Sequence, residues 1–149
     1  MILRPNSPEF REMVRAYMVC ILWTMPGPDN DENPGDRYTP ERFTKEARIV
    51  CAADCLEFLN RVQRMRLSPW VWQSSERFTL SGYGPAQFGH DLALSRNGHG
   101  AGFFDRDALS VPADPDIPGS QSLGDVLQEI AREMGERSIV NARGWIHCE

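Results

Sequence analysis

GHDLALSRNGHGAGFFDR, residues 89–106, contains the pair Asn97-Gly98, and this pair decides the fold that the sequence predicts. Asn-Gly favours a two-residue type I′ turn, because both central residues of that turn need a positive φ. Short runs of mixed apolar and polar residues flank the pair on both sides. The pattern therefore predicts a β-hairpin whose strands are Asp91–Arg96 and His99–Phe104.

A two-residue turn also fixes which side chains of the hairpin share a face. One face, expected to pack on helices, is formed by Leu92, Leu94, Ala101 and Phe103. The opposite face is formed by Ala93, Ser95, Gly100 and Gly102. The second face is nearly bare of side chains, and glycine in a strand often marks the close approach of a ligand or another backbone. An exposed strand edge also pairs readily with a second copy of the chain, so a homodimer is one expectation.

Two helix-start signals precede the hairpin. Ser7-Pro8-Glu9 places an N-cap, a first-turn proline and an acid in the order typical of a helix N-terminus, and the apolar spacing that follows predicts a helix that ends near Thr24. Thr39-Pro40-Glu41 repeats the signal and predicts a second helix to about Arg66, before Pro69. We expect these helices to pair as an antiparallel αα-hairpin.

A third helix and a last strand follow the hairpin. Ser122 is the expected N-cap of the helix, with Asp125 at the third helical position and Gly135 closing the C-terminus. Ser138–Asn141 and Gly144–His147 read as strands and predict a last strand or a short hairpin.

Together these elements predict an α+β fold. The length of 149 residues suits a single domain spanning 1–149. Within it, 1–66 is the expected helical part. The expected β-hairpin–helix–strand part is 89–149, and its strands form a small antiparallel sheet.

Acidic residues are concentrated in one segment. The chain has a net charge of -5, whereas 105–136 alone has eight acids against two arginines. Such a segment disfavours non-specific nucleic-acid binding, which requires cations, and suits a basic protein partner or simply a solvated surface. The candidate acidic surface consists of Asp114, Asp116, Asp125, Glu129 and Glu133.

The apolar and cysteine content predicts a cytoplasmic protein. The apolar run 16–24 is too short to span a bilayer, and we expect no contact with a membrane. No secretory signal is visible, so we expect the four cysteines to be reduced.

Neither of two possible metal sites is favoured by the sequence, so no cofactor is expected. Cys51 and Cys55, one helical turn apart, could bind zinc with His147 and Cys148, but cysteines on an apolar stripe usually belong to a core. The segment 29–34 resembles the start of a calcium loop, with proline where glycine is required.

Polar residues are dense in the predicted hairpin and its ends. A ligand or partner could be bound by His90, Asp91, Arg96, Asn97, His99, Asp105 and Arg106. Acid–base chemistry is the alternative, since histidine and carboxylate side chains can exchange protons near neutral pH. In a hairpin, however, Ser95 and His99 point to opposite faces, which disfavours a serine nucleophile.

The stretch 89–106 resembles a segment of many small proteins encoded by bacteriophages and related mobile elements, which reads close to GHDFWLTRNGHGAGFWDR. The similarity extends loosely to the N-terminal helical part and to Leu123–Ile146. This chain departs from the pattern at Leu92-Ala93, where aromatic residues are usual, and in a long insert at Ser110–Gln121. The resemblance implies a phage or mobile-element origin and a host cytoplasm, and it implies no particular activity.

These observations favour a non-enzymatic binding protein of phage type that inhibits a host protein or nucleoprotein complex, such as a CRISPR–Cas or other defence effector. Small size, the absence of a catalytic motif, the acidic segment and the bare face of the predicted hairpin, which is open to a partner, motivate this hypothesis. The alternative is a small enzyme or ligand-binding module that uses the His, Asp and Arg residues of the predicted hairpin.

Overall fold

The computed structural model describes residues 7–24, 38–65, 72–74, 77–78, 83–114, 116–117 and 119–149. The calcium-like segment 29–34 lies outside these ranges.

The first predicted helix is confirmed. Helix α1 spans Pro8–Thr24, and the hydroxyl oxygen of Ser7 accepts a hydrogen bond from the Phe10 N–H at 3.1 Å. Because this bond satisfies one of the free N–H groups of the first turn, Ser7 acts as the N-cap.

The second helix begins later than predicted. Thr39 introduces only η1 (Pro40–Arg42), a single 3₁₀ turn. The chain then extends at Phe43, and α3 (Lys45–Arg64) begins after Thr44, whose hydroxyl accepts a hydrogen bond from the Ala47 N–H at 3.0 Å. The predicted start signal at Thr39 therefore introduces η1, and the helix itself is capped by Thr44, five residues later.

The predicted β-hairpin is wrong, because its first strand is helical. Helix α5 spans Pro85–Arg96 and Asn97 is its C-cap. Gly98 follows with a φ of 68°, the left-handed conformation that closes many helices. Asn-Gly therefore suits a helix C-terminus as well as a type I′ turn, since each places a residue at positive φ.

The second predicted strand, His99–Phe104, is also not a strand. The chain after α5 runs as a loop into the 3₁₀ turns η2 (Phe103–Asp105) and η3 (Asp107–Leu109). The strand edge predicted to mediate a homodimer and the bare strand face are therefore absent at 91–104.

The C-terminal elements agree with the sequence. Helix α6 spans Leu123–Glu133, and Ser122 caps it by accepting a hydrogen bond from the Asp125 N–H at 3.2 Å. Strands β3 (Ile139–Ala142) and β4 (Trp145–Cys148) form an antiparallel hairpin. A second antiparallel pair joins β1 (Trp72–Ser74) to β2 (Arg77–Phe78).

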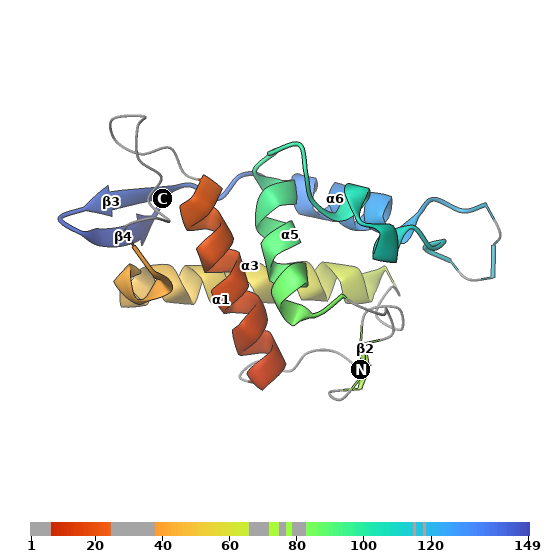
Figure 1. The fold of residues 1–149 in the computed structure, drawn as a ribbon, viewed down its shortest axis with the longest axis horizontal. Helices are drawn as coiled ribbons and strands as arrows, with labels where there is room; N and C mark the ends of the chain where they lie inside the picture. Colours follow the sequence, from red (N-terminus) through yellow and green to blue (C-terminus); the bar gives the residue numbers. More distant parts are fainter. Residues whose placement is uncertain are drawn as a thin grey trace.

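Helix α5 takes the place that the prediction gave to a strand pair, in the middle of the molecule. Figure 1 shows α1 alongside α5, with α3 passing behind both and α6 beside α5. The predicted antiparallel pairing of the first two helices is wrong, because α1 makes its main contact with α5 and crosses α3. Gly89 permits this contact: a Cβ atom there would collide with the carbonyl oxygen of Met13.

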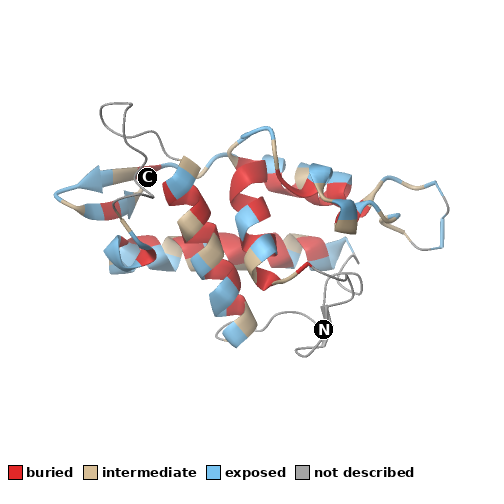
Figure 2. Cartoon of the chain, viewed as in Figure 1, coloured by how far each residue is buried: buried red, intermediate tan, exposed pale blue. Residues whose placement is uncertain are grey.

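One hydrophobic core joins the N-terminal and C-terminal elements, with buried residues on every helix (Figure 2). At its centre the rings of Phe58, Phe88 and Phe103 lie with their centroids 5.3 to 5.4 Å apart. These rings come from α3, α5 and η2. The fold is α+β, and within the described ranges no helix has both the length and the apolar character needed to cross a membrane.

Candidate functional site

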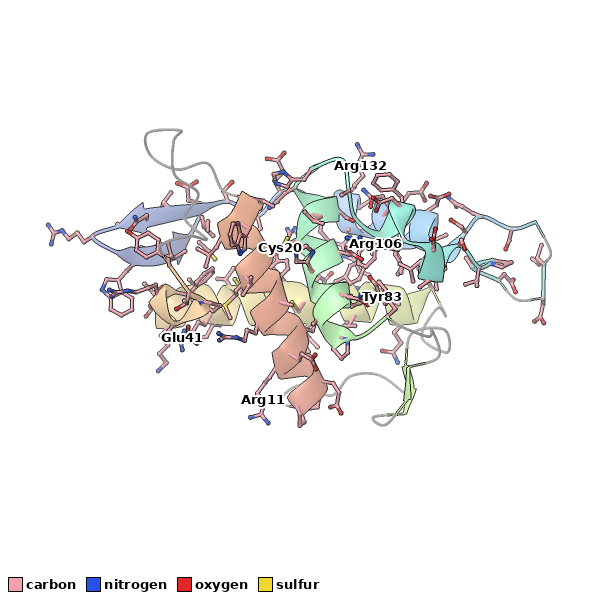
Figure 3. The ribbon with its side chains drawn as sticks, in the orientation of Figure 1. Arg11, Cys20, Glu41, Tyr83, Arg106 and Arg132 are labelled. Carbon is pink, nitrogen blue, oxygen red and sulfur yellow. The ribbon has the colours of Figure 1, made fainter. Side chains whose placement is uncertain are left out.

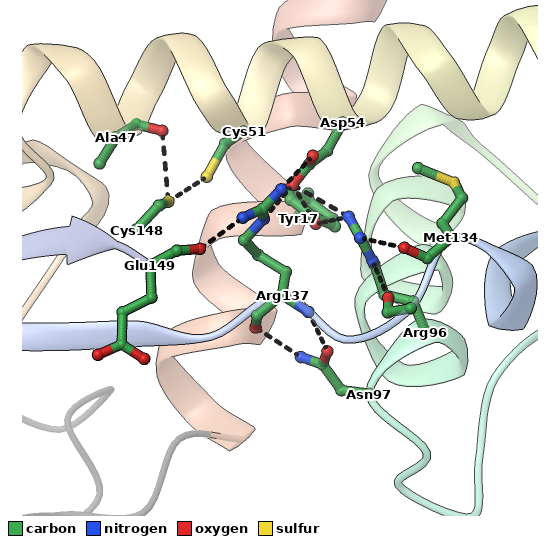
Figure 4. A network of polar contacts seen from close by, with 11 residues as sticks. Tyr17, Ala47, Cys51, Asp54, Arg96, Asn97, Met134, Arg137, Cys148 and Glu149 are labelled. Atoms are coloured by element: carbon green, nitrogen blue, oxygen red, sulfur yellow. Dashed lines mark hydrogen bonds and ion pairs between the residues drawn. The ribbon is translucent and has the colours of Figure 1, made fainter.

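A buried carboxylate, Asp54 on α3, connects three parts of the chain (Figure 4). Arg137 donates to it twice, from Nε to Oδ2 at 2.7 Å and from Nη2 to Oδ1 at 2.9 Å. The Tyr17 hydroxyl donates to Oδ2 at 2.8 Å, and Arg96 Nη1 lies 3.0 Å from the same oxygen. One acid thus holds α1, α5 and the segment after α6 together.

Arg96 also fixes the end of α6. Its Nε donates to the Gly135 carbonyl at 2.7 Å, and its Nη2 donates to the Met134 carbonyl at 3.1 Å. Carbonyls at a helix C-terminus lack partners within the helix and carry partial negative charge, so a guanidinium is a favourable partner for them. Its side chain is only 4% exposed. Arg96 is therefore a structural residue.

Asn97 joins the end of α5 to the backbone of Arg137. Its Oδ1 accepts a hydrogen bond from the Arg137 N–H at 2.9 Å, and its Nδ2 donates to the Arg137 carbonyl at 3.4 Å. The side-chain amide of Asn97 thus bonds both the N–H and the carbonyl of Arg137, as the backbone of a neighbouring β-strand would.

A second buried carboxylate, Asp91 on α5, anchors the loop after the helix. The Arg106 guanidinium donates to both of its oxygens, with the shortest bond from Nη2 to Oδ1 at 2.7 Å. The Tyr83 hydroxyl donates to Oδ2 at 2.7 Å. Figure 3 shows Tyr83 and Arg106 beside α5. The Asp91 hydrogen bond is the main cause that raises the pKa of Arg106.

Burial raises the pKa of both tyrosines that bond these carboxylates, Tyr17 and Tyr83. Burial is the main cause that raises the pKa of Tyr17 far above its ordinary value of 10.0, and Asp54 adds to it. Burial, together with Asp91, does the same to Tyr83. Each hydroxyl therefore remains a hydrogen-bond donor to its carboxylate throughout the neutral range.

The seven candidate residues of 89–106 do not form one site. Asp91, Arg96, Asn97 and Arg106 are held in the bonds described above. His90 is exposed on α5, whereas His99 lies beyond the end of that helix and lines a pocket of about 250 Å³. The exposed Asp105 accepts a hydrogen bond from the Gly102 N–H at 3.1 Å.

A serine nucleophile finds no support in this geometry. Ser95 is buried on α5, where its hydroxyl donates to Gln128 Oε1 at 2.6 Å and accepts from the Phe103 N–H at 3.2 Å. Its hydroxyl therefore joins α5 to α6 and η2. Of the residues that the alternative hypothesis needs, His99 lines the 250 Å³ pocket, whereas Asp91 and Arg106 are bonded to each other and His90 is exposed on α5.

The described residues contain no group of three or more His, Cys, Asp or Glu side chains placed to hold a metal ion. The zinc set of Cys51, Cys55, His147 and Cys148 is therefore not assembled. His147 is exposed, whereas Cys51 and Cys55 are buried in the core as the apolar spacing indicates.

The candidate acidic surface is largely exposed. Of its residues, Asp116 lies in the loop before α6, and Asp125, Glu129 and Glu133 lie on the outer side of α6; all four are exposed, and Asp114 is partly exposed. Among the described residues, none of these five carboxylates forms an ion pair. Two large apolar side chains in the same part of the chain are also exposed, Phe104 at 45% and Ile117 at 56%.

The sequence reasoning missed a concave surface on the opposite part of the molecule. Two adjoining hollows of about 380 and 450 Å³ follow α1, η1 and α3 and share Glu41, Arg48 and Ala52. Trp145, 46% exposed, lines one hollow, and the Arg42 guanidinium stacks over its ring at 5.3 Å. These residues come from distant parts of the chain, so no local pattern could reveal the surface.

The sequence reasoning also missed the Asp54 network, although one signal was present. Asp54 interrupts the apolar stripe of its helix, and an acid at a core-facing position indicates a buried partner. Nothing local identifies Arg137 as that partner.

Comparison with known proteins adds no relative: no protein-family model, curated protein or solved structure matches the sequence.

Proposed function

We propose that this protein binds and inhibits a host protein or nucleoprotein complex as a phage-type accessory protein, and that a CRISPR–Cas or other defence effector is its target. The proposal is supported by the set of exposed carboxylates along α6 and the loop before it. Unpaired acids on a helix surface contribute little to folding, and they are suited to meet a basic surface on another protein.

The candidate acidic surface, called the acidic face from here on, would act by imitating the negative charge of nucleic acid. Effectors that bind nucleic acid have grooves lined with Lys and Arg, which are complementary to closely spaced phosphates. Carboxylates spaced along one helix face can pair with the same cations and block the groove. Phe104 and Ile117 add apolar contact beside the charges, which favours a long-lived complex over a transient electrostatic one.

The polar residues of 89–106 have a supporting role in this proposal. Asp91, Arg96, Asn97 and Arg106 hold α5, α6 and η2 in place, and so position the acidic face. Of the seven candidates, His90, His99 and Asp105 remain exposed and able to contact the partner directly.

The test compares two variants with equal loss of charge. One variant carries Asp116→Asn, Glu129→Gln and Glu133→Gln. The control carries Glu12→Gln, Glu46→Gln and Glu57→Gln, at surface positions on α1 and α3. Tagged proteins are used to capture partners from a bacterial lysate at several salt concentrations, and each protein is expressed in cells whose CRISPR–Cas system targets an infecting phage.

We expect the wild-type protein and the control to retain a stoichiometric partner and to restore plaque formation. The acidic-face variant should lose about tenfold or more in binding, with a weaker dependence on salt. Unchanged binding and unchanged salt dependence in that variant would exclude the acidic face as the interface. Absence of any specific partner for the wild type would contradict the proposal as a whole.

A further inference from the structure

Two cysteines that are far apart in the sequence face each other between α3 and β4. The Sγ atoms of Cys51 and Cys148 are 3.8 Å apart, although 97 residues separate them in the sequence. Figure 4 shows both sulfur atoms in the space between the helix and the strand, beside Arg137. All four cysteines have free thiols in this structure.

The two thiols differ in exposure. Cys51 is completely buried, whereas Cys148 is partly exposed. A small oxidant can therefore reach Cys148 first, and Cys51 lies in contact with it on the buried side. This arrangement of one accessible thiol and one protected neighbour is the one that a two-step oxidation requires.

Hydrogen bonding and charge favour the same order. The Cys148 thiol donates to the Ala47 carbonyl at 3.7 Å, which leaves its sulfur free to accept from the Cys51 thiol. That acceptance is the main cause that lowers the pKa of Cys148, and the nearby Arg137 cation adds to it, against the opposing effects of burial and Asp54. The same hydrogen bond raises the pKa of Cys51. Because the thiolate is the reactive form of cysteine, the partly exposed sulfur of Cys148 is also the more reactive one.

We propose that Cys148 and Cys51 are a peroxide-responsive pair, in which Cys148 is the attacked residue and Cys51 is the resolving residue. The Cys148 thiolate attacks one oxygen of hydrogen peroxide, the O–O bond breaks, and the released hydroxide takes a proton to leave as water. The Cys51 sulfur then attacks the resulting Cys148 sulfenic acid, and a second water leaves with the Cys51 proton. Two thiols and one peroxide thus give one disulfide and two waters.

The disulfide would join the last strand to the central part of α3. A bond of about 2.05 Å requires the sulfurs to approach further, through a change of side-chain rotamer at one or both cysteines. Because the closed loop is long, the bond should stabilise the protein against unfolding. This inference is independent of the proposed inhibitor function, since neither cysteine belongs to the acidic face.

The experiment uses the full reduced chain, freed of reductant and treated with hydrogen peroxide in the presence or absence of dimedone, which traps sulfenic acid. Intact mass and peptide mapping follow the products. The variants are Cys148→Ser and Cys51→Ser, and the matched controls are Cys20→Ala and Cys55→Ala, which alter the other two buried thiols. Circular dichroism and urea unfolding establish that each variant is folded.

We expect the wild-type protein and both controls to lose two hydrogen atoms and to yield a Cys51–Cys148 peptide that dithiothreitol separates. Cys51→Ser should accumulate a dimedone adduct at Cys148, and Cys148→Ser should form neither product. If a variant fails to fold, the rate of alkylation of each cysteine in the wild-type protein tests the assignment of Cys148 as the attacked residue. Cys148 should react about tenfold faster than the other cysteines. Adducts at other cysteines only, or disulfides only between molecules, would overturn the proposal.

Discussion

Asp54 illustrates how one side chain can determine the arrangement of several helices. Its two oxygens receive hydrogen bonds from Tyr17 and Arg137 and an ion pair from Arg96. A buried guanidinium that loses its counter-charge is costly, even where the intact pair contributes little net stability. Substitution at Asp54 should therefore affect stability much more than substitution of a surface acid.

We predict that Asp54→Asn lowers the free energy of unfolding by about 3–5 kcal/mol, because Arg96 and Arg137 remain buried or partly buried without a compensating charge. Urea unfolding at neutral pH measures the change. Glu57→Gln is the matched control: Glu57 lies one turn further along α3 and bonds Arg61 at the surface at 2.9 Å, so its loss should be below about 1 kcal/mol. Equal losses in the two variants would contradict the assignment of Asp54 as the central buried charge.

At the scale of single residues, the sequence predicted positions better than partners. The acid in the apolar stripe of α3 was visible, as were the N-caps Ser7 and Ser122. The ion-pair partners were not, because Asp54 meets Arg137 83 residues later in the chain. Only the packing of helices brings such residues together.

At the scale of elements, α5 shows why a helix can lack a helical pattern. Amphipathic helices such as α6 bury one face and expose the other, and this periodicity was read correctly. Helix α5 is buried around most of its circumference, including the polar residues Asp91, Ser95 and Arg96. Apolar and polar residues therefore follow one another in its sequence without a clear period. The Asn-Gly pair at its end then led to the wrong prediction of a hairpin. The signal that was missed is Gly84-Pro85, which places proline in the first turn of the helix.

The close contact of α1 and α5 gives a prediction at this scale. Gly89→Ala should lower the free energy of unfolding by about 1–3 kcal/mol, because its methyl group would force the helices apart. Alanine has the higher helix propensity, so propensity alone predicts a gain of about 1 kcal/mol, and the sign of the change separates the two effects. Thermal and urea unfolding measure it.

Gly84→Ala is the control for this substitution. Gly84 precedes α5 with a φ of -114°, and a Cβ there meets nothing within 4 Å. Its effect on stability should stay within about 1 kcal/mol. A stabilising Gly89→Ala would show that α1 and α5 are further apart than the structure indicates.

At the scale of the whole molecule, the two buried tyrosines predict a sharp alkaline limit. Their pKa is raised in the folded protein above the ordinary value of 10.0, so above about pH 10 the unfolded chain releases protons that the folded chain retains. The stability that these groups contribute is fully present below pH 10 and is lost as the pH rises further. The slope should reach about 1.4 kcal/mol per pH unit for each tyrosine.

The absorbance of tyrosinate, followed together with circular dichroism between pH 7 and 12, tests this prediction. Tyr17 and Tyr83 should ionise only as the helices unfold, so the two signals should change together. Tyr17→Phe should remove one of the two cooperative ionisations. Ionisation of both side chains in a protein that keeps its helices would contradict the burial described here.

The order in which the residues of the Asp54 network are translated affects how the cell can detect incomplete chains. Asp54 is translated early and its partner Arg137 late, so a nascent chain that stalls between them has the acid without its second cation. Such a fragment cannot close the contact between α3 and the segment after α6, and it leaves apolar surface open to chaperones and proteases. A chain must therefore be translated past Arg137 before it can satisfy the network.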